Sequence, residues 1–287
     1  MRVVGSMTTL PIRLPYIRPV IQSILRQNRK LDVLYLNIPT RTLKGEEYEF
    51  NEEFFDGLDR LKIVRCKDIG PITKLLPVLD EEIDPDTRII TFDDDVIVNR
   101  QVVGILMERA SAYPDCVLSF SGWRVGNLLP LLELVRSSDS DTEVDWVQGC
   151  HTIMYKRSML DKQEIMQSFP DAPAALFKND DHRISAYLAT KNIPRIALKE
   201  DSRILFKPEA HSYISSISGN IMFNYQVFSI VLHFWQKGIY RKSCTITNSV
   251  VFWVVITMIL LGIVLKHSFG NRPSEIRTRV SNSEFHM

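Results

Sequence analysis

Three consecutive aspartates, Asp93, Asp94 and Asp95, stand between two apolar segments of this chain. The segment before them, 88–92, is rich in β-branched residues, as a buried strand would be. Carboxylates this close together repel each other, and burying them without a partner is costly. A divalent cation with hard oxygen ligands relieves both effects. In extended chain alternate side chains share a face, so Asp93 and Asp95 are expected to point together, away from Asp94. The pattern predicts a metal site.

The alternative is a surface turn in which the three acids are simply solvated. A solvated turn does not require a buried strand on each side, however. The apolar segments that bracket the aspartates therefore favour the metal site.

Strands and helices alternate through the first hundred residues, and these elements must position the aspartates. The expected strands are 3–6, 32–38, 61–66 and 88–92, and the expected helices are 14–26 and 73–79. This alternation predicts an α/β fold with a mostly parallel, Rossmann-like central sheet flanked by helices. Open sheets of this kind bind ligands at the carboxyl ends of their strands, which is where the aspartates fall.

The second half of the chain continues the mixed pattern. We expect helices at 102–113 and 182–190 and strands at 116–120, 150–155 and 195–198, with an acidic loop at 137–143. The apolar stretch 217–235 is interpreted either as a core helix or as a helix on a membrane surface.

Composition excludes several classes of protein. The chain has 287 residues, 45% of them apolar and 24% charged, which is typical of a globular protein. A net charge of +1 and the lack of a basic stripe argue against a nucleic-acid partner. The four cysteines form no Cys-x-x-Cys pair, which argues against a zinc site or a disulfide framework and favours reduced thiols in the cytosol.

The C-terminal region differs from the rest in its hydropathy. Residues 250–265 carry no charge, and with 245–249 they approach the ~20 residues that cross a bilayer. Basic residues flank the stretch, so we expect a transmembrane helix at 246–266 and a polar tail at 267–287. The alternative is a buried core helix. Because the N-terminus has no signal-peptide pattern, the prediction is a single-pass membrane protein with its main domain in the cytosol.

Five segments, in order along residues 1–200, resemble one known family. They are Met7-Thr8-Thr9-Leu10-Pro11, Gly70 to Leu75, Phe92 to Val96, Val147-Gln148-Gly149 and Asn179-Asp180-Asp181. Together they are similar to nucleotide-sugar-dependent glycosyltransferases of the GT-A fold that carry an Asp-x-Asp motif. Within these, the chain resembles the small glycosyltransferase-like proteins of algae, plants and large algal viruses. The resemblance implies a GT-A domain over residues 1–235.

The resemblance also implies a donor site. Asp95 would bind Mn²⁺ or Mg²⁺, and Asp93 would touch the metal or the ribose, so that the cation bridges the phosphates of a UDP-sugar. Asp94 would belong to the residues that bind the donor. The hydroxyls of Thr8 and Thr9 would contact the base and ribose.

Two basic residues complete this implied donor site. Arg13 and Lys74 would face the diphosphate or the sugar as fixed positive charges. The alternative for each is an ordinary solvated charge.

An acidic pair would serve the acceptor. Asp181, with Asp180 beside it, takes the position of the general base that deprotonates an acceptor hydroxyl on a glycan, protein or lipid. Acids at a helix start can also be simple caps, because they satisfy free N–H groups. Gly149 would let the backbone approach the sugar, or would only mark a bend.

Many proteins of this fold take a third metal ligand from a late histidine. His211 is the candidate here, with His151 and His182 as rivals. The segment around His211 matches the family pattern poorly, which leaves the third ligand open.

Two functions other than a glycosyltransferase are alternatives for this pattern. A haloacid-dehalogenase-type phosphatase also ends a strand with Asp-x-Asp, but its motif follows the first strand and has Thr or Val where this chain has Ile97. A catalytically inactive, membrane-tethered binding protein on the same fold is the other alternative. The set of Thr8, Lys74, Asp93, Asp95 and Asp181 favours the enzyme.

Overall fold

The computed structural model describes residues 1–126, 132–136, 140–149, 152–199, 207–208 and 221–240. All of these belong to the first of two units, Met1–Cys244 and Thr245–Met287. The predicted transmembrane segment 246–266, the tail 267–287 and the histidines His151 and His211 lie outside the described residues. Among the helices in the described ranges, none combines the length and the apolar composition that a membrane crossing requires.

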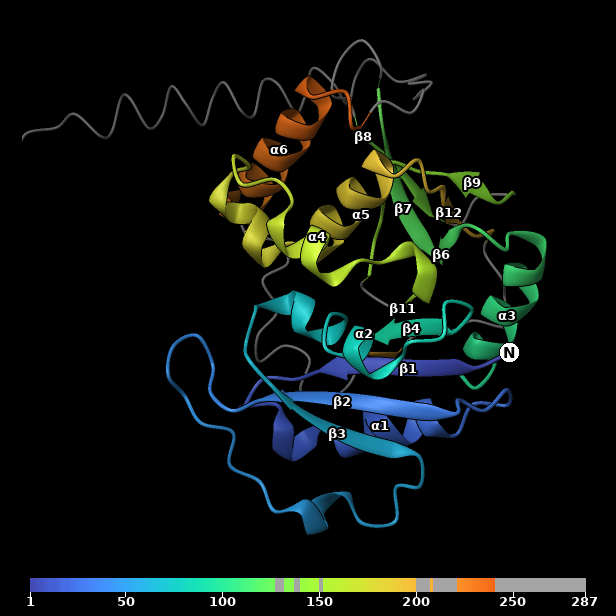
Figure 1. Cartoon of the computed structure of the whole chain (residues 1–287), viewed down its shortest axis with the longest axis vertical. Coiled ribbons are helices and arrows are strands. Elements are labelled where there is room, and N and C mark those ends of the chain that lie inside the picture. Colours follow the sequence, from blue (N-terminus) through green and yellow to red (C-terminus); the bar gives the residue numbers. More distant parts are fainter. Residues whose placement is uncertain (127–131, 137–139, 150–151, 200–206, 209–220, 241–287) are drawn as a thin grey trace, which may run out of the picture. The chain divides into compact units, whose positions relative to one another are not determined.

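Within the described residues, eight strands form one central sheet in the order β3-β2-β1-β4-β11-β6-β12-β9 (Figure 1). The four N-terminal strands run parallel to one another, as predicted, and β11 runs antiparallel to both β4 and β6. The strands are β1 Val3–Thr8, β2 Val33–Pro39, β3 Leu61–Cys66, β4 Arg88–Phe92, β6 Val117–Ser119, β9 Thr142–Glu143, β11 Thr152–Lys156 and β12 Arg195–Ala197.

Helices cover both faces of this sheet because its strands are apolar on both sides. Along β1, Val3 and Met7 face one core cluster and Val4 faces the other. The first cluster includes α1 (Arg18–Leu25) and α3 (Val102–Ala112). The second includes the 3-10 turn η3 (Pro71–Lys74) and the helices α2 (Val78–Glu81), α4 (Lys162–Gln167) and α5 (Asp180–Thr190). The predicted α/β fold, with a mainly parallel central sheet flanked by helices, is confirmed.

Short strands and a late helix build a third core cluster. β7 (Ser121–Val125) pairs with β8 (Leu132–Arg136) and β10 (Trp146–Val147), and β5 (Val96–Ile97) pairs with β13 (Lys207–Pro208). The helix α6 (Ile221–Gln236) buries Ile230, Val231 and Phe234 completely, together with residues of α5 and β10. Of the two interpretations of 217–235, the core helix is therefore the one that the structure shows for this part of α6.

Two predicted elements differ from the structure for physical reasons. The predicted helix 14–26 is a 3-10 turn, η1 (Leu14–Tyr16), followed by α1, which begins at Arg18 with Pro19 in its first turn. Proline is tolerated there because it has no N–H to donate, whereas in a helix interior it would clash with the preceding turn. The predicted acidic loop 137–143 ends in the edge strand β9, which pairs with β12.

Candidate active site

The carboxyl ends of neighbouring strands bring most of the predicted site residues to one edge of the sheet. β1 and β4 are adjacent and parallel, so Thr9 and Asp93, which follow them, leave the sheet at the same edge. β11 is antiparallel to β4, with Thr152 opposite Phe92, so the chain enters β11 at this edge too. Gly149 precedes that strand by a few residues, and α5 brings Asp180 and Asp181 to the same cluster.

Asp93 follows the end of β4, and Asp94 and Asp95 form a turn that leads into β5, so the three do not continue the strand. The alternation of side chains along a strand therefore does not set the directions of these three side chains. Arg13 forms ion pairs with both Asp94 and Asp95, the second at 3.1 Å from Nη1 to Oδ2. Asp93 turns instead to Lys74, with 3.2 Å between its Oδ1 and the Nζ.

Asp94 is the inner member of the triplet. It accepts a hydrogen bond of 2.7 Å from the Thr9 hydroxyl and is paired with Arg13, which is itself buried. Burial raises the pKa of Asp94, against the opposing effects of Arg13 and Thr9. The side chains of Asp93 and Asp95 are 26% and 29% exposed, against 11% for Asp94. Asp93 and Asp95 are thus the two that a ligand can reach, and Asp94 anchors the turn to the loop after β1.

Lys74 links the aspartate turn to α5. Its Nζ lies 3.2 Å from Asp93 Oδ1 and 3.0 Å from Asp180 Oδ2, and the residue is only 9% exposed. Its carbonyl oxygen accepts a 2.6 Å hydrogen bond from the Ser6 hydroxyl, and Asn37 donates to the same oxygen. Burial alone would lower the pKa of Lys74, but the carboxylates of Asp180 and Asp93 raise it well above its ordinary value. Lys74 is therefore a permanent internal cation.

The two acids that begin α5 act on other elements and not as caps. Asn179, at the N-cap, makes no side-chain capping bond among the described residues. Asp180 pairs with Lys74, and Asp181 Oδ2 accepts a 2.8 Å hydrogen bond from the Gly149 N–H. Asp181 Oδ1 is buried and has no hydrogen-bond partner in the described part of the chain. Burial, reinforced by Asp180, raises the pKa of Asp181 to about 6.

Gly149 is required by the packing of Asp181. A Cβ at position 149 would lie 2.5 Å from Asp181 Oδ1, which is closer than real Cβ contacts allow. The glycine therefore lets a backbone N–H and a carboxylate meet directly, and the alternative of a simple bend does not account for this contact.

Two other predicted residues serve the structure around the site. The Thr8 hydroxyl donates to the Asn37 carbonyl at 2.8 Å and so links β1 to β2. His182, a rival for the third metal ligand, is buried against Trp146, with 4.4 Å between the ring centroids, and its Nδ1 is 3.4 Å from the Tyr240 hydroxyl. Burial lowers the pKa of His182 to about 3. His182 is thus a buried, neutral histidine packed against Trp146.

Sequence reasoning missed Ser6 and Asn37, which fix the Lys74 backbone. Both are polar side chains that are fully buried within strands. Asn37 also donates to the Ser6 hydroxyl at 3.0 Å. A polar residue inside an otherwise apolar strand needs a hydrogen-bond partner, and that is the signal that would have drawn attention to them.

The donor set fits a cation that is shared with a ligand. Within the described ranges, no three His, Cys, Asp or Glu side chains converge as a metal cage would require. Mg²⁺, however, is commonly bound by one or two carboxylates together with substrate phosphates. Asp93 and Asp95 are two such carboxylates, and burial raises the pKa of Asp93 to about 7, against the effect of Lys74. The raised pKa means that Lys74 does not fully offset the burial of this carboxylate. A divalent cation bound there would supply the missing positive charge.

No family model matches the chain, and no curated protein matches it in sequence. Solved structures are similar in fold. Residues 1–349 of S. aureus TarS, in complex with UDP-GlcNAc, align with a TM-score of 0.50 and 13% identity over 82% of this chain and 66% of that one. This chain thus spans just under two thirds of that TarS structure.

Two further structures align with TM-scores too low to support an argument. Another structure of S. aureus TarS 1–349 has a TM-score of 0.47 at 11% identity, covering 82% of this chain and 72% of that one. A 4-diphosphocytidyl-2C-methyl-D-erythritol synthase has 0.45 at 8% identity, covering 80% and 99%. The likeness to the UDP-GlcNAc complex shows the fold alone, and the mainly parallel sheet with its helices fits the Rossmann-like GT-A fold that the sequence predicts.

Proposed function

We propose that this chain is a nucleotide-sugar-dependent glycosyltransferase that moves a sugar from a UDP-sugar to a hydroxyl acceptor. The observation that carries the proposal is the position of Lys74, between Asp93 of the aspartate turn and Asp180 at the start of α5. One buried ammonium thereby holds a candidate donor site beside a candidate base. A similar fold in a protein solved with UDP-GlcNAc supports the choice of donor.

Asp93 and Asp95 are the residues that would hold Mn²⁺ or Mg²⁺ together with the donor phosphates. When bound, the cation would stabilise the negative charge that develops on the departing nucleoside diphosphate. Arg13 and Lys74 add fixed positive charge around these carboxylates. Positive charge already in place where negative charge develops lowers the barrier, because nothing has to reorganise during the reaction.

Asp181 would accept the proton of the acceptor hydroxyl. Its Oδ1 has no hydrogen-bond partner in the described part of the chain, and the Gly149 N–H holds Oδ2 in place. With a pKa of about 6, the carboxyl group is ionised near neutral pH and is a stronger base than an ordinary aspartate. If Asp181 deprotonates the acceptor hydroxyl and the acceptor oxygen then attacks the sugar directly, the reaction inverts the anomeric configuration.

The acceptor and the membrane attachment are also part of the proposal. We take the acceptor to be a hydroxyl on a glycan, protein or lipid, as the family resemblance implies. Attachment through 246–266, with the catalytic domain in the cytosol, rests on sequence hydropathy.

Calorimetry of UDP binding to the full-length protein, with and without Mn²⁺, tests the proposal. We expect binding that depends on Mn²⁺ and is lost in Asp95→Asn, because one of two cation ligands is removed. The matched control is Asp59→Asn, which neutralises an exposed aspartate just before β3, at the opposite edge of the sheet.

The negative outcomes separate the alternatives. Release of phosphate from phosphomonoesters without UDP binding would indicate the phosphatase. Absence of both nucleotide binding and turnover would indicate the inactive binding protein. Equal UDP affinity in wild type and Asp95→Asn would remove Asp95 from the donor site.

A further inference from the structure

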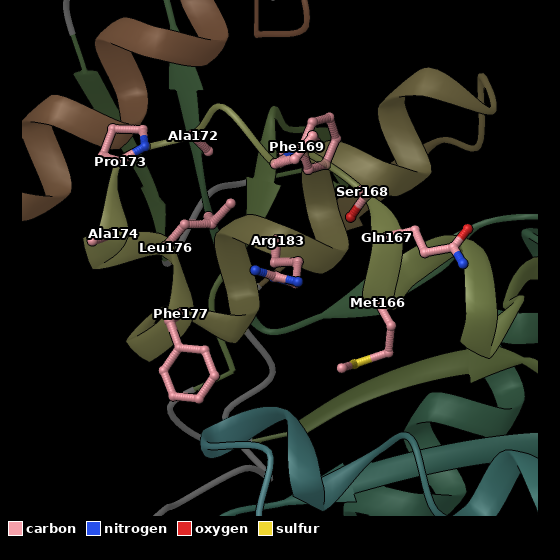
Figure 2. A pocket seen from close by; sticks show the side chains of 11 residues that line it. Met166, Gln167, Ser168, Phe169, Ala172, Pro173, Ala174, Leu176, Phe177 and Arg183 are labelled. Carbon is pink, nitrogen blue, oxygen red and sulfur yellow. The ribbon is translucent and has the colours of Figure 1, made fainter.

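A cavity of about 360 Å³ lies beside α5, between the end of α4 and the 3-10 turn η5 (Ala174–Lys178) (Figure 2). Apolar and polar surface contribute about equally to its lining, and Arg183 is the charged residue among the side chains that line it. Figure 2 shows the side chains of Arg183, Phe177 and Met166 among those that line this cavity. None of the residues assigned above to the donor site or the base lines this cavity.

Arg183 carries a half-buried charge that the described residues leave uncompensated. Burial lowers its pKa, and no carboxylate in the described part of the chain raises it again. A guanidinium nevertheless stays protonated in a protein, so the charge persists and its burial has a cost. An anion in the cavity would offset that cost and would find a planar group that can donate two hydrogen bonds at once.

The carboxylates on the surrounding elements are engaged elsewhere. Asp171, in the loop between α4 and η5, pairs with Lys237. Glu164 of α4 pairs with Lys191 at 2.5 Å, and Asp161 caps α4 through the Glu164 N–H. The acids of α5 are held by Lys74 and by the Gly149 N–H. These acids are therefore engaged with other partners, and none of them pairs with Arg183 within the described residues.

The apolar side chains suit a ring attached to that anion. Phe177 and Met166 line the cavity and are each 43% exposed, so their apolar surface is accessible to a ligand. Phe177 contributes an aromatic face to the lining and Arg183 a cation, and this pair of features matches a ligand with a charged end and a ring whose C–H face can stack.

The cavity adjoins the candidate active site through two elements. Arg183 follows Asp180 by three residues, so the two side chains lie on the same side of α5, one turn apart. Phe177 packs against Gly70, where a Cβ would lie 3.0 Å from its ring, and Gly70 leads into the turn that carries Lys74.

We propose that this cavity binds the anionic end of a sugar acceptor, with Arg183 pairing its phosphate or carboxylate and Phe177 stacking on the sugar ring. The inference rests on the proposed function, because it takes the ligand to be the acceptor. The residue that makes the pocket selective is then Arg183, which would favour acidic sugars over neutral ones.

The test is calorimetry on the full-length protein with UDP and Mn²⁺ present, titrating glucose 6-phosphate, glucuronate, glucose and inorganic phosphate. We expect one of the two acidic sugars to bind, and which one binds identifies the anion. Arg183→Gln should weaken this binding at least about tenfold, since hydrogen bonds to a charged group are lost. Phe177→Ala should weaken the sugar but not inorganic phosphate. Lys178→Gln, which removes an exposed charge next to the lining, should change nothing.

Each contrary result has one meaning. If UDP binds but neither acidic sugar does, or if Arg183→Gln binds them as wild type does, the acceptor pocket is wrong. If inorganic phosphate binds as tightly as the sugar phosphate and Phe177→Ala has no effect, the cavity is only an anion site. If UDP itself does not bind, the proposed function fails, while the Arg183→Gln comparison still decides whether the cavity takes acidic sugars. Circular dichroism of each variant shows whether it is folded.

Discussion

At the scale of single residues, the candidate site depends on contacts between segments far apart in the chain. Asp94 meets Thr9 and Arg13 across more than eighty positions of sequence. Residue types and spacing located each of these side chains, but they could not show that Asp94 is buried while Asp93 and Asp95 are partly exposed. The turn geometry decides this, and three identical residues in a row carry no signal for it.

Gly149→Ala should separate catalysis from donor binding. The added Cβ meets Asp181 Oδ1 and must displace it, so we expect kcat to fall by about 10²-fold or more, the usual contribution of a positioned base. UDP affinity should stay within about twofold. Gly104→Ala is the matched control, because its Cβ would make only an ordinary 3.8 Å contact with Arg29. Steady-state kinetics check the result, and unchanged kcat in Gly149→Ala would remove Asp181 from the base position.

The pH dependence of the rate follows from the same carboxyl group. Burial raises the pKa of Asp181 to about 6, and a base works only in its ionised form. The rate should therefore rise with pH, tenfold per pH unit well below 6, and level off above it. A pH profile of kcat measures this. A rate that is flat from pH 5 to 7, or a profile unchanged in Asp181→Asn, would contradict the assignment.

At the scale of elements, Lys74 fastens α5 to the carboxyl edge of β4. Lys74→Met keeps an unbranched side chain one atom shorter than lysine and leaves Asp93 and Asp180 without their cation. Removing one partner of a buried ion pair typically lowers the free energy of unfolding by about 3–5 kcal/mol. Because Asp93 is partly exposed, we expect a loss near the lower value for Lys74→Met.

Urea denaturation measures the loss, and two further variants interpret it. Lys62→Met breaks an exposed pair with Glu81 and should cost less than about 1 kcal/mol. Adding Asp180→Asn to Lys74→Met should recover part of the stability, since it removes one of the stranded charges. If Lys74→Met were no less stable than Lys62→Met, the link between β4 and α5 would not be structural.

The elements themselves were predictable to very different degrees. Long apolar segments such as β4 and α3 agree with their predicted ranges to within a residue, because both faces of the sheet are covered and the pattern is strong. The small strands β7, β8 and β10 were not predicted. A two-residue strand such as β10 has too few residues to show a period, and it is defined by its pairing with β7, far away in the sequence.

At the scale of the whole molecule, α6 completes the third core cluster and is an integral part of the described fold. Phe234 is fully buried there and stacks edge to face with Phe169 and Tyr240. Phe234→Ala should lower the free energy of unfolding by about 3–5 kcal/mol, because it leaves a large cavity.

The control for this prediction is Gln236→Ala, at the exposed end of the same helix, which should change stability by less than about 0.5 kcal/mol. Thermal or urea unfolding of the two variants gives the comparison. Equal stabilities would mean that α6 adds nothing to the core, and the membrane-surface interpretation of this helix would return.

The charges at the carboxyl edge have a consequence for what the site can admit. The carboxylates of Asp93, Asp94, Asp95, Asp180 and Asp181 gather there around the two cations Arg13 and Lys74, so negative charge is in excess. A bare diphosphate would be repelled by that excess, whereas one that arrives complexed with a divalent ion would be attracted. The protein would thus discriminate between two chemical forms of the same nucleotide, and a chelator would empty the site reversibly while leaving every residue unchanged.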